Sequence, residues 1–219
     1  MRSRLTIMTL LALCLALFSL GCTKQPRTTA DIPRSLSPSY SIAVAPFTQP
    51  TSTSQLIVGE IPRDQGRIAP EMLPALDRTL RDVLLTETKR QYTFVPRHAP
   101  LPDKMRYHDS NQPQALPAWA AFAKSLKTDL LLVPQVLNWH PREGSRAGVT
   151  RPAHVRVEFF LINARQGTIL DRSVYDVEQT SLTSNLLEIG DFLKRQAGWA
   201  TADELAREGM VKAVKDMTL

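Results

Sequence analysis

The sequence predicts an α/β (α+β) fold: a mixed β-sheet with helices packed on it, followed by a C-terminal helical segment. In the first half of the chain, short apolar strands at residues 40–47 and 92–95 flank a run with helical spacing at residues 72–89. Residues 155–177 form two runs of alternating apolar and polar side chains around a turn, which is typical of a β-hairpin. Strands interleaved with helices favour a sheet that carries helices on its faces.

Four helices are expected from apolar spacing and from capping signals. The first spans residues 72–89 and begins near Glu71, because Pro74 is tolerated only in a first helical turn. The second spans residues 117–127. Residues 184–196 and a helix opened by the capping box of residues 201–204 form the C-terminal segment. The last of these helices carries its apolar face on Ala206, Met210, Ala213, Val214 and Met217.

Further strands are expected at residues 130–139 and, as a short piece, at residues 56–58. Pro134 interrupts the first of these runs and indicates a sheet edge or a bulge. Residues 140–152 are expected to form a polar loop. Apolar residues on the inner sides of these elements form the predicted core, and we expect Leu80, Leu132, Val157 and Phe159 to be buried.

The amino terminus has the layout of a secretory signal peptide. Arg2 and Arg4 precede an apolar run over residues 5–20, which is short for a membrane span of about 20 residues. The alternative is an uncleaved anchor helix. No later stretch of the sequence is long and apolar enough to span a bilayer.

Residues 19–22 read Ser-Leu-Gly-Cys and resemble the bacterial lipobox, whose final cysteine receives lipid. Cys22 is therefore the predicted lipid-attachment site, although the lipobox prefers leucine where Ser19 stands. Cleavage by an ordinary secretory peptidase, which would leave Cys22 unmodified, is the alternative. Cys14 lies inside the segment to be removed, so no disulfide framework and no thiolate metal site is expected. Two or three acyl chains would anchor the chain durably, at about 0.8 kcal/mol for each buried CH2.

These signals divide the chain into four regions. A signal peptide at residues 1–21 is followed by a flexible, lipid-anchored tether at residues 22–39, which is rich in proline, serine and threonine. An α/β domain then covers residues 40–180. The C-terminal helices of residues 181–219 are expected to pack on that domain.

Charge and motifs exclude several functions. The sequence holds 27 basic and 21 acidic residues, and loss of Arg2 and Arg4 leaves 25 against 21, a mature excess of +4 with interspersed signs. No nucleic-acid partner is expected from so mild a balance. None of the nucleophile, phosphate-loop, dinucleotide or zinc-protease motifs occurs, and no catalytic residue, metal ligand or cofactor is predicted.

A partner contact is predicted at Trp139, His140 and Arg142, where an aromatic ring, an imidazole and a charge gather at a strand end. The competing interpretation is that Trp139 covers the edge of the core and that the other two side chains are solvated. Arg156 and Glu158 share one strand face and are expected to form a surface ion pair, which contributes little to stability.

The order of motifs between residues 41 and 177 resembles the group that contains the amino-terminal domain of TolB and the curli-secretion lipoprotein CsgG. Residues 41–47, Ser-Ile-Ala-Val-Ala-Pro-Phe, are similar to the opening strand of that group. The later matching motifs are the helix and strand of residues 73–95, the segment of residues 121–136, and the hairpin of residues 155–170 with Asn163 and Gly167.

The resemblance implies a non-enzymatic assembly or regulatory module of an envelope complex. The expected partners are the membrane, through the lipid, and an envelope protein or a second copy of the chain. Thr23 stands where aspartate commonly signals retention in the inner membrane, so the expected location is the periplasmic side of the outer membrane. The alternatives are a subunit of an oligomeric ring or secretion channel, and a periplasmic hydrolase with an unrecognised site. A pore is not expected, because the sequence lacks spare amphipathic hairpins.

Overall fold

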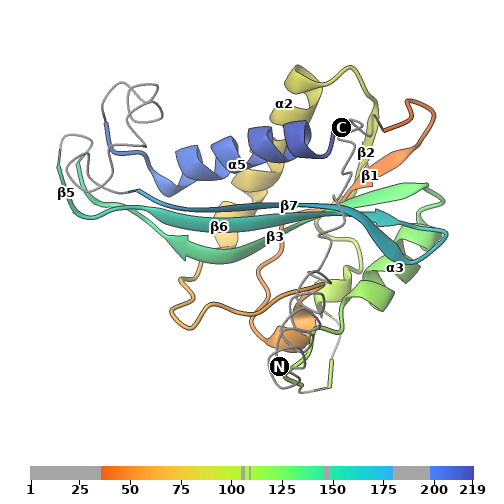
Figure 1. Ribbon diagram of the computed structural model, residues 1–219, viewed down its shortest axis with the longest axis horizontal. Helices are drawn as coiled ribbons and strands as arrows, with labels where there is room; N and C mark the ends of the chain where they lie inside the picture. The colour runs from red at the N-terminus through yellow and green to blue at the C-terminus, as the bar shows by residue number, and fades with distance from the viewer. Residues whose placement is uncertain (1–35, 105–106, 109, 146–147, 180–197) are drawn as a thin grey trace, which may run out of the picture. The chain divides into compact units, whose positions relative to one another are not determined.

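The computed structural model describes residues 36–104, 107–108, 110–145, 148–179 and 198–219 (Figure 1). The predicted signal peptide, Cys22, nearly all of the tether and the helix expected at residues 184–196 lie outside the described residues. Within the described part no helix is long and apolar enough to cross a membrane.

A five-stranded mixed sheet forms the centre of the domain, in the order β2-β1-β3-β6-β7. The short strands β1 (Ile42–Val44) and β2 (Tyr92–Phe94) are parallel to each other, and β1 is also parallel to β3 (Leu130–His140). β3, β6 (His154–Asn163) and β7 (Thr168–Glu178) are antiparallel. The predicted mixed sheet and the predicted hairpin are both confirmed.

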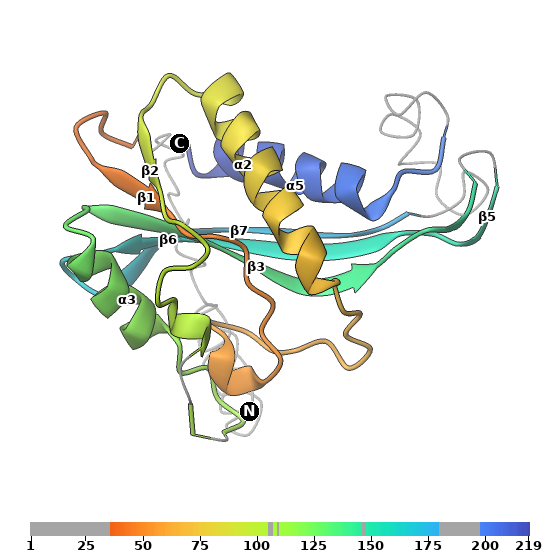
Figure 2. The same cartoon turned by 180° about the vertical axis from the view of Figure 1, so that it is seen from behind.

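The first face of the sheet is covered by α2 (Leu73–Glu87) and α5 (Ala202–Asp216), which lie side by side (Figure 2). The predicted capping box opens α5, because the Thr201 hydroxyl accepts from the Glu204 N–H while the Glu204 carboxylate accepts from the Thr201 N–H. At Gly209 an added Cβ would lie 2.9 Å from Val157 Cγ2, so the glycine allows α5 to approach the sheet closely.

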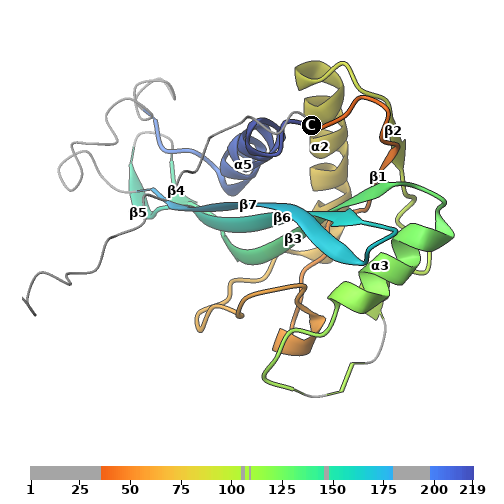
Figure 3. The same cartoon turned by 45° about the vertical axis from the view of Figure 1, so that its right-hand side comes forward.

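The second face is covered by α3 (Leu116–Ser125) and by irregular chain, which includes the 3₁₀ turns Thr53–Gln55 and Pro102–Lys104 (Figure 3). A third 3₁₀ turn, Pro70–Met72, leads directly into α2, and its Met72 packs against the core of the first face. Lys127 follows α3 with φ of 55°, in the left-handed region that ends a helix. The core on this side includes Ala43, Trp119, Leu131, Val133, Phe160 and Ile162.

All four predicted core residues are buried, with exposed fractions of 2% for Leu80, 1% for Leu132 and 0% for Val157 and Phe159. They belong to the cluster between the sheet and the helices α2 and α5. The alternation in β6 differs from that of a half-exposed strand, because residues on both faces are buried. A sheet with covering layers on both sides leaves only a small part of its central strands in contact with water.

The prediction of a sheet edge at Pro134 is wrong, because β3 lies at the centre of the sheet between β1 and β6. The Pro134 carbonyl accepts from the Thr48 N–H at 3.3 Å. The N–H and C=O of one strand residue point to the same side, so the N–H that proline lacks would also face the chain that follows β1. β1 has already ended at Val44, and the proline therefore removes no bond from that ladder.

A bulge does occur in β3, three residues beyond Pro134. Val136 pairs with Val157 and Asn138 pairs with Arg156, so Leu137 is an extra residue in the register. The bulge reverses which faces the following side chains occupy. Before it, Leu132 and Val136 face α2 and α5; after it, Trp139 does.

Two further expectations differ from the structure. Residues 56–58 form no strand, although Leu56 and Ile57 are buried beneath the second face. The polar loop expected at residues 140–152 contains a small two-stranded sheet of β4 (Glu143–Gly144) and β5 (Val149–Arg151). Backbone pairing gives this loop more order than its composition indicates.

Candidate functional site

The predicted contact residues lie at the far end of β3, on opposite sides of the sheet. Trp139 is 4% exposed and belongs to the core on the side of α2 and α5. The next residue, His140, faces the other way, because side chains alternate along a strand. The interpretation of Trp139 as a cover for the core edge is therefore correct for its ring, and the three residues form no single cluster.

Trp139 and Arg142 do meet at one pocket of about 400 Å³ beside the start of α5. Three separate stretches of chain line it: the segment before α2, the end of β3 and the first turn of α5. Its lining residues are Arg67, Ala69, Met72, Trp139, Pro141, Arg142, Thr201, Ala202 and Asp203. The pocket thus combines an apolar floor with two guanidinium groups.

The polar groups of this pocket have structural contacts of their own. The Arg142 Nη1 donates to the backbone carbonyl of Trp199, which ties the end of β3 to the chain entering α5. The Thr201 hydroxyl is used in the capping box. Burial raises the pKa of the Asp203 carboxyl above its usual range, with a smaller contribution from the neighbouring Glu204 charge and an opposing hydrogen bond from its own N–H.

His140 points toward the irregular segment of residues 49–68, which we call the strap. Its Nε2 donates to the carbonyl oxygen of Asp64 at 3.0 Å. The strap is also held at Gly66, whose N–H donates to Asn138 Oδ1 at 2.6 Å. An added Cβ at Gly66 would lie 2.3 Å from the Trp139 carbonyl oxygen, so only glycine lets the strap lie directly on the backbone of β3.

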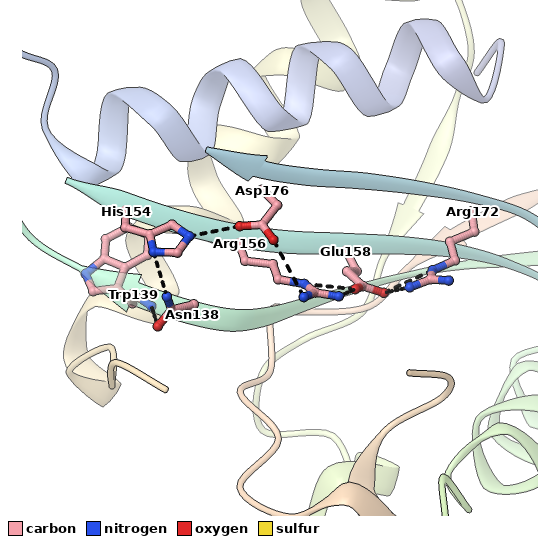
Figure 4. A network of polar contacts seen from close by, with 7 residues as sticks. All are labelled: Asn138, Trp139, His154, Arg156, Glu158, Arg172 and Asp176. Atoms are coloured by element: carbon pink, nitrogen blue, oxygen red, sulfur yellow. Dashed lines mark hydrogen bonds and ion pairs between the residues drawn. The ribbon is translucent and has the colours of Figure 1, made fainter. Parts of the chain in front are cut away.

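His154 continues this polar network across the sheet (Figure 4). Its ring stacks against that of His140, with centroids 6.2 Å apart. The Asn138 Oδ1 accepts from Gly66 and Trp139 N–H groups, so its Nδ2 is the atom that donates to His154 Nδ1 at 3.1 Å. His154 Nε2 then donates to the carboxylate of Asp176 at 2.9 Å. Both ring nitrogens of His154 are thus bonded within the fold.

Glu158 lies at the centre of the network and is fully buried, with a side-chain exposure of 0%. Its Oε1 accepts from Arg156 Nε at 3.2 Å and Nη2 at 2.8 Å. Its Oε2 accepts from Arg172 Nε at 3.0 Å and Nη2 at 2.6 Å. The predicted ion pair between Arg156 and Glu158 forms, at 2.8 Å, but its expected place at the surface is wrong, because a second arginine from β7 and the covering strap enclose the carboxylate.

The cover over Glu158 comes from chain that is distant in sequence. Gln135, which pairs with Glu158 across the two strands, donates from its Nε2 to the Gln55 carbonyl of the strap at 3.3 Å. Gly59 lies in the same region, where an added Cβ would be 3.7 Å from Arg172 Nη2. The alternating charge on β6 gives a signal for polar pairing, but it does not indicate burial.

No group of three or more histidine, cysteine, aspartate or glutamate side chains in the described part of the chain could hold a metal ion. The carboxylate of Glu158 is already surrounded by arginine donors, and that of Asp176 by His154 and, at 3.6 Å, by Arg156. The arrangement binds the strands and the strap together. Its chemistry is therefore that of a structural network.

No protein-family model matches the sequence, and neither does any curated protein. Several solved bacterial structures are similar to this chain. A PelC dodecamer from Paraburkholderia phytofirmans is 13% identical with a TM-score of 0.47, where the match covers 84% of this chain and 91% of the other. Lipoprotein GNA1162 from Neisseria meningitidis is 14% identical with a TM-score of 0.38, over 72% and 95% of the two chains.

The C-terminal domain of LpoB from Salmonella enterica is 14% identical with a TM-score of 0.33, over 64% of this chain and 83% of that one. At such identities and TM-scores the likeness carries no argument about this chain. The resemblance of residues 41–177 to the TolB and CsgG group remains a prediction from the sequence.

Proposed function

We propose that the chain is a non-enzymatic module of a bacterial envelope complex, lipid-anchored at Cys22 and facing the periplasm from the outer membrane. The membrane part of the proposal is supported by the order of Arg2 and Arg4, the apolar run and Cys22 in the sequence. The domain part is supported by the resemblance to the TolB and CsgG group. In that proposal the described α+β domain contacts protein partners while the tether holds it at the membrane.

One observation carries the non-enzymatic part of the proposal. Glu158, the fully buried carboxylate at the centre of the network, has both oxygens bonded to arginine side chains. A general base needs an accessible lone pair within reach of a substrate. The carboxylate is instead used to join β6 and β7, and the neighbouring imidazole of His154 joins Asp176 to Asn138.

The proposed partner surface is the pocket at the end of β3 with the adjoining β4–β5 hairpin. Apolar floor residues such as Trp139 and Met72 lie beside the two arginines, Arg67 and Arg142. Aromatic and arginine side chains are enriched where proteins bind each other. Loops that are held on a rigid sheet commonly carry such binding surfaces.

The anchoring part is tested by replacing Cys22 with alanine. We expect the Cys22→Ala chain to lose incorporation of labelled fatty acid and to remain unprocessed or move to the soluble fraction, because two or three acyl chains supply the membrane affinity. Fractionation and metabolic labelling in a bacterial host measure both effects. Equal labelling of the two chains would show that lipid is attached elsewhere, and recovery with the inner membrane would contradict the proposed location.

The partner surface is tested by reversing one of its charges. Arg67 is exposed and lines the pocket, so we expect Arg67→Glu to reduce crosslinking to envelope partners in the native host while leaving the unfolding midpoint nearly unchanged. Arg165→Glu is the matched control, since Arg165 is 86% exposed at the opposite end of β6. Equal capture by both variants and by the unaltered chain would remove the pocket from the proposal.

A further inference from the structure

Among the described residues, the eleven-residue strand β7 is the long free edge of the sheet and pairs only with β6. The hydrogen-bond pattern shows which of its backbone groups point outward. The Ala45 N–H donates to the Leu132 carbonyl and the Val136 N–H donates to the Thr48 carbonyl, so even-numbered residues in this part of β3 bond toward β1. Odd-numbered residues of β3 before the bulge therefore bond to β6.

The same alternation continues across the sheet. The β3 partners Val133 and Gln135 pair with Phe160 and Glu158, which leaves the odd-numbered residues of β6 to bond to β7. On β7 their partners are the odd-numbered residues Asp171, Ser173, Tyr175 and Val177. The backbone groups of Arg172, Val174, Asp176 and Glu178 consequently face away from the sheet.

Two contacts agree with this assignment. The Gln179 N–H donates inward to the Ala153 carbonyl at 3.2 Å. The outward Arg172 N–H donates at 2.7 Å to the side chain of its own neighbour, Asp171. Among the described residues no backbone group pairs with the outward N–H groups of Val174, Asp176 and Glu178.

We propose that β7 pairs with β7 of a second copy of this chain, antiparallel about a two-fold axis at Val174. This inference names a second copy of the chain as the partner in the proposed function. It rests on the proposed function only in placing both copies on one membrane. In this register Arg172 of each copy lies directly opposite Asp176 of the other. Opposite charges that face each other across two strands stabilise the pair, whereas like charges destabilise it.

Among registers whose two-fold axis lies on a residue with outward backbone groups, charge selects this one. An axis at Arg172 would place arginine opposite arginine, and an axis at Asp176 would place aspartate opposite aspartate. Between these two, only Val174 is an outward residue that is uncharged. Arg172, Val174 and Asp176 are positive, neutral and negative in turn. Two antiparallel copies of this segment therefore place opposite charges against each other.

Both charged side chains are placed to make the contact. Arg172 holds Glu158 through Nε and Nη2, so its Nη1 is outside that contact. The Asp176 side chain is 42% exposed, and its Oδ2 has only an ion pair at 3.6 Å to Arg156. Asp171 must release the Arg172 N–H for the ladder to form, and its exposed side chain can turn to solvent.

Attachment to a membrane favours such a contact. A ladder of a few residues between two edges is weak in dilute solution, because each copy loses its freedom of motion on association. Lipid anchors hold both copies at one surface and raise their effective concentration. The pairing is therefore expected to be stronger on membranes than in solution.

The test places a single cysteine on the proposed axis in the full, membrane-bound chain. Paired residues that exchange both hydrogen bonds have Cα atoms about 5.5 Å apart, which a disulfide can span. We expect Val174→Cys to give a covalent dimer on mild oxidation. Glu178→Cys is the matched control on the same outward edge, since its two copies would lie roughly 27 Å apart at 3.4 Å per residue. The parent chain sets the background from Cys22.

A second variant removes the edge bond without touching the fold. Val174→Pro deletes an outward N–H that the sheet does not use, so the unfolding midpoint should stay close to that of the parent. The membrane-bound dimer, trapped here with an amine-reactive crosslinker because this variant has no cysteine at 174, should be lost. If this variant fails to fold, the comparison of the two cysteine variants decides alone. Equal dimer from Val174→Cys and Glu178→Cys, or none from either, overturns the proposal. Absence of a dimer from Val174→Cys, with membrane attachment and partner capture intact, overturns this pairing and leaves the proposed function standing.

Discussion

Replacing Glu158 with alanine is expected to lower the free energy of unfolding by about 3 kcal/mol or more. The change leaves Arg156 and Arg172 in a partly buried site without the carboxylate that accepts their four close N–H contacts. Their side chains are 26% and 34% exposed, so they can turn partly to water, which places the cost at the lower end for a broken buried pair. Denaturant unfolding followed by circular dichroism measures the loss.

The matched control for this result is Glu143→Ala. Glu143 pairs with Arg151 at 3.2 Å, but the two side chains are 58% and 61% exposed. Such a pair is worth roughly 0–1 kcal/mol. Glu158→Gln should fall between the two, because it keeps the shape and one acceptor oxygen but loses the charge. If Glu158→Ala shifted stability no more than Glu143→Ala does, the buried cluster would not hold the strands together.

Truncation of the neighbouring residue Phe159 to alanine is expected to cost about 3–5 kcal/mol. Phe159 is 0% exposed on the opposite face of β6 and meets Phe47 edge to face, with ring centroids 6.0 Å apart. Removing the ring leaves a cavity between the sheet and α2 and α5, which close packing cannot refill. For a domain of this size the thermal midpoint should fall on the order of 10 °C.

Leu170→Ala provides the control on the same hairpin, because Leu170 is 41% exposed. Its substitution should change the free energy of unfolding by no more than about 0.5 kcal/mol. Phe159→Leu, which conserves much of the volume, should recover part of the loss. A midpoint for Phe159→Ala equal to that of Leu170→Ala would mean that the facing of β6 is assigned incorrectly.

The largest elements of the fold follow from local sequence signals. The helix expected at residues 72–89 appears as α2, and the capping box at Thr201 opens α5. The alternating runs on either side of residues 163–168 form the hairpin of β6 and β7, with Gly167 at φ of 69° in its turn. Each of these signals depends on residues a few positions apart, which is the range that helix and hairpin geometry couples.

The candidate site follows from the sequence only in part. Arg142 and Trp139 do share a pocket, yet His140 lies on the other face and belongs to the polar network. The bulge at Leu137 reverses the side-chain order just before these residues. A one-residue shift exchanges the two faces of a strand, and nothing in the local pattern of residues 130–140 records it.

The sequence by itself determined the type of most elements, the apolar side of α2, α5 and β6, and the likeness of residues 19–22 to a lipobox. Only the tertiary structure decided that Glu158 is buried, that Arg172 joins Arg156 around it, and that the strap closes over them. Periodicity records which side chains are apolar, because apolar burial needs no particular partner. Burial of a charge needs specific donors. Here one of them, Arg172, comes from another strand, and the cluster is covered by chain about 100 residues earlier, so the meeting of these groups is set by the fold.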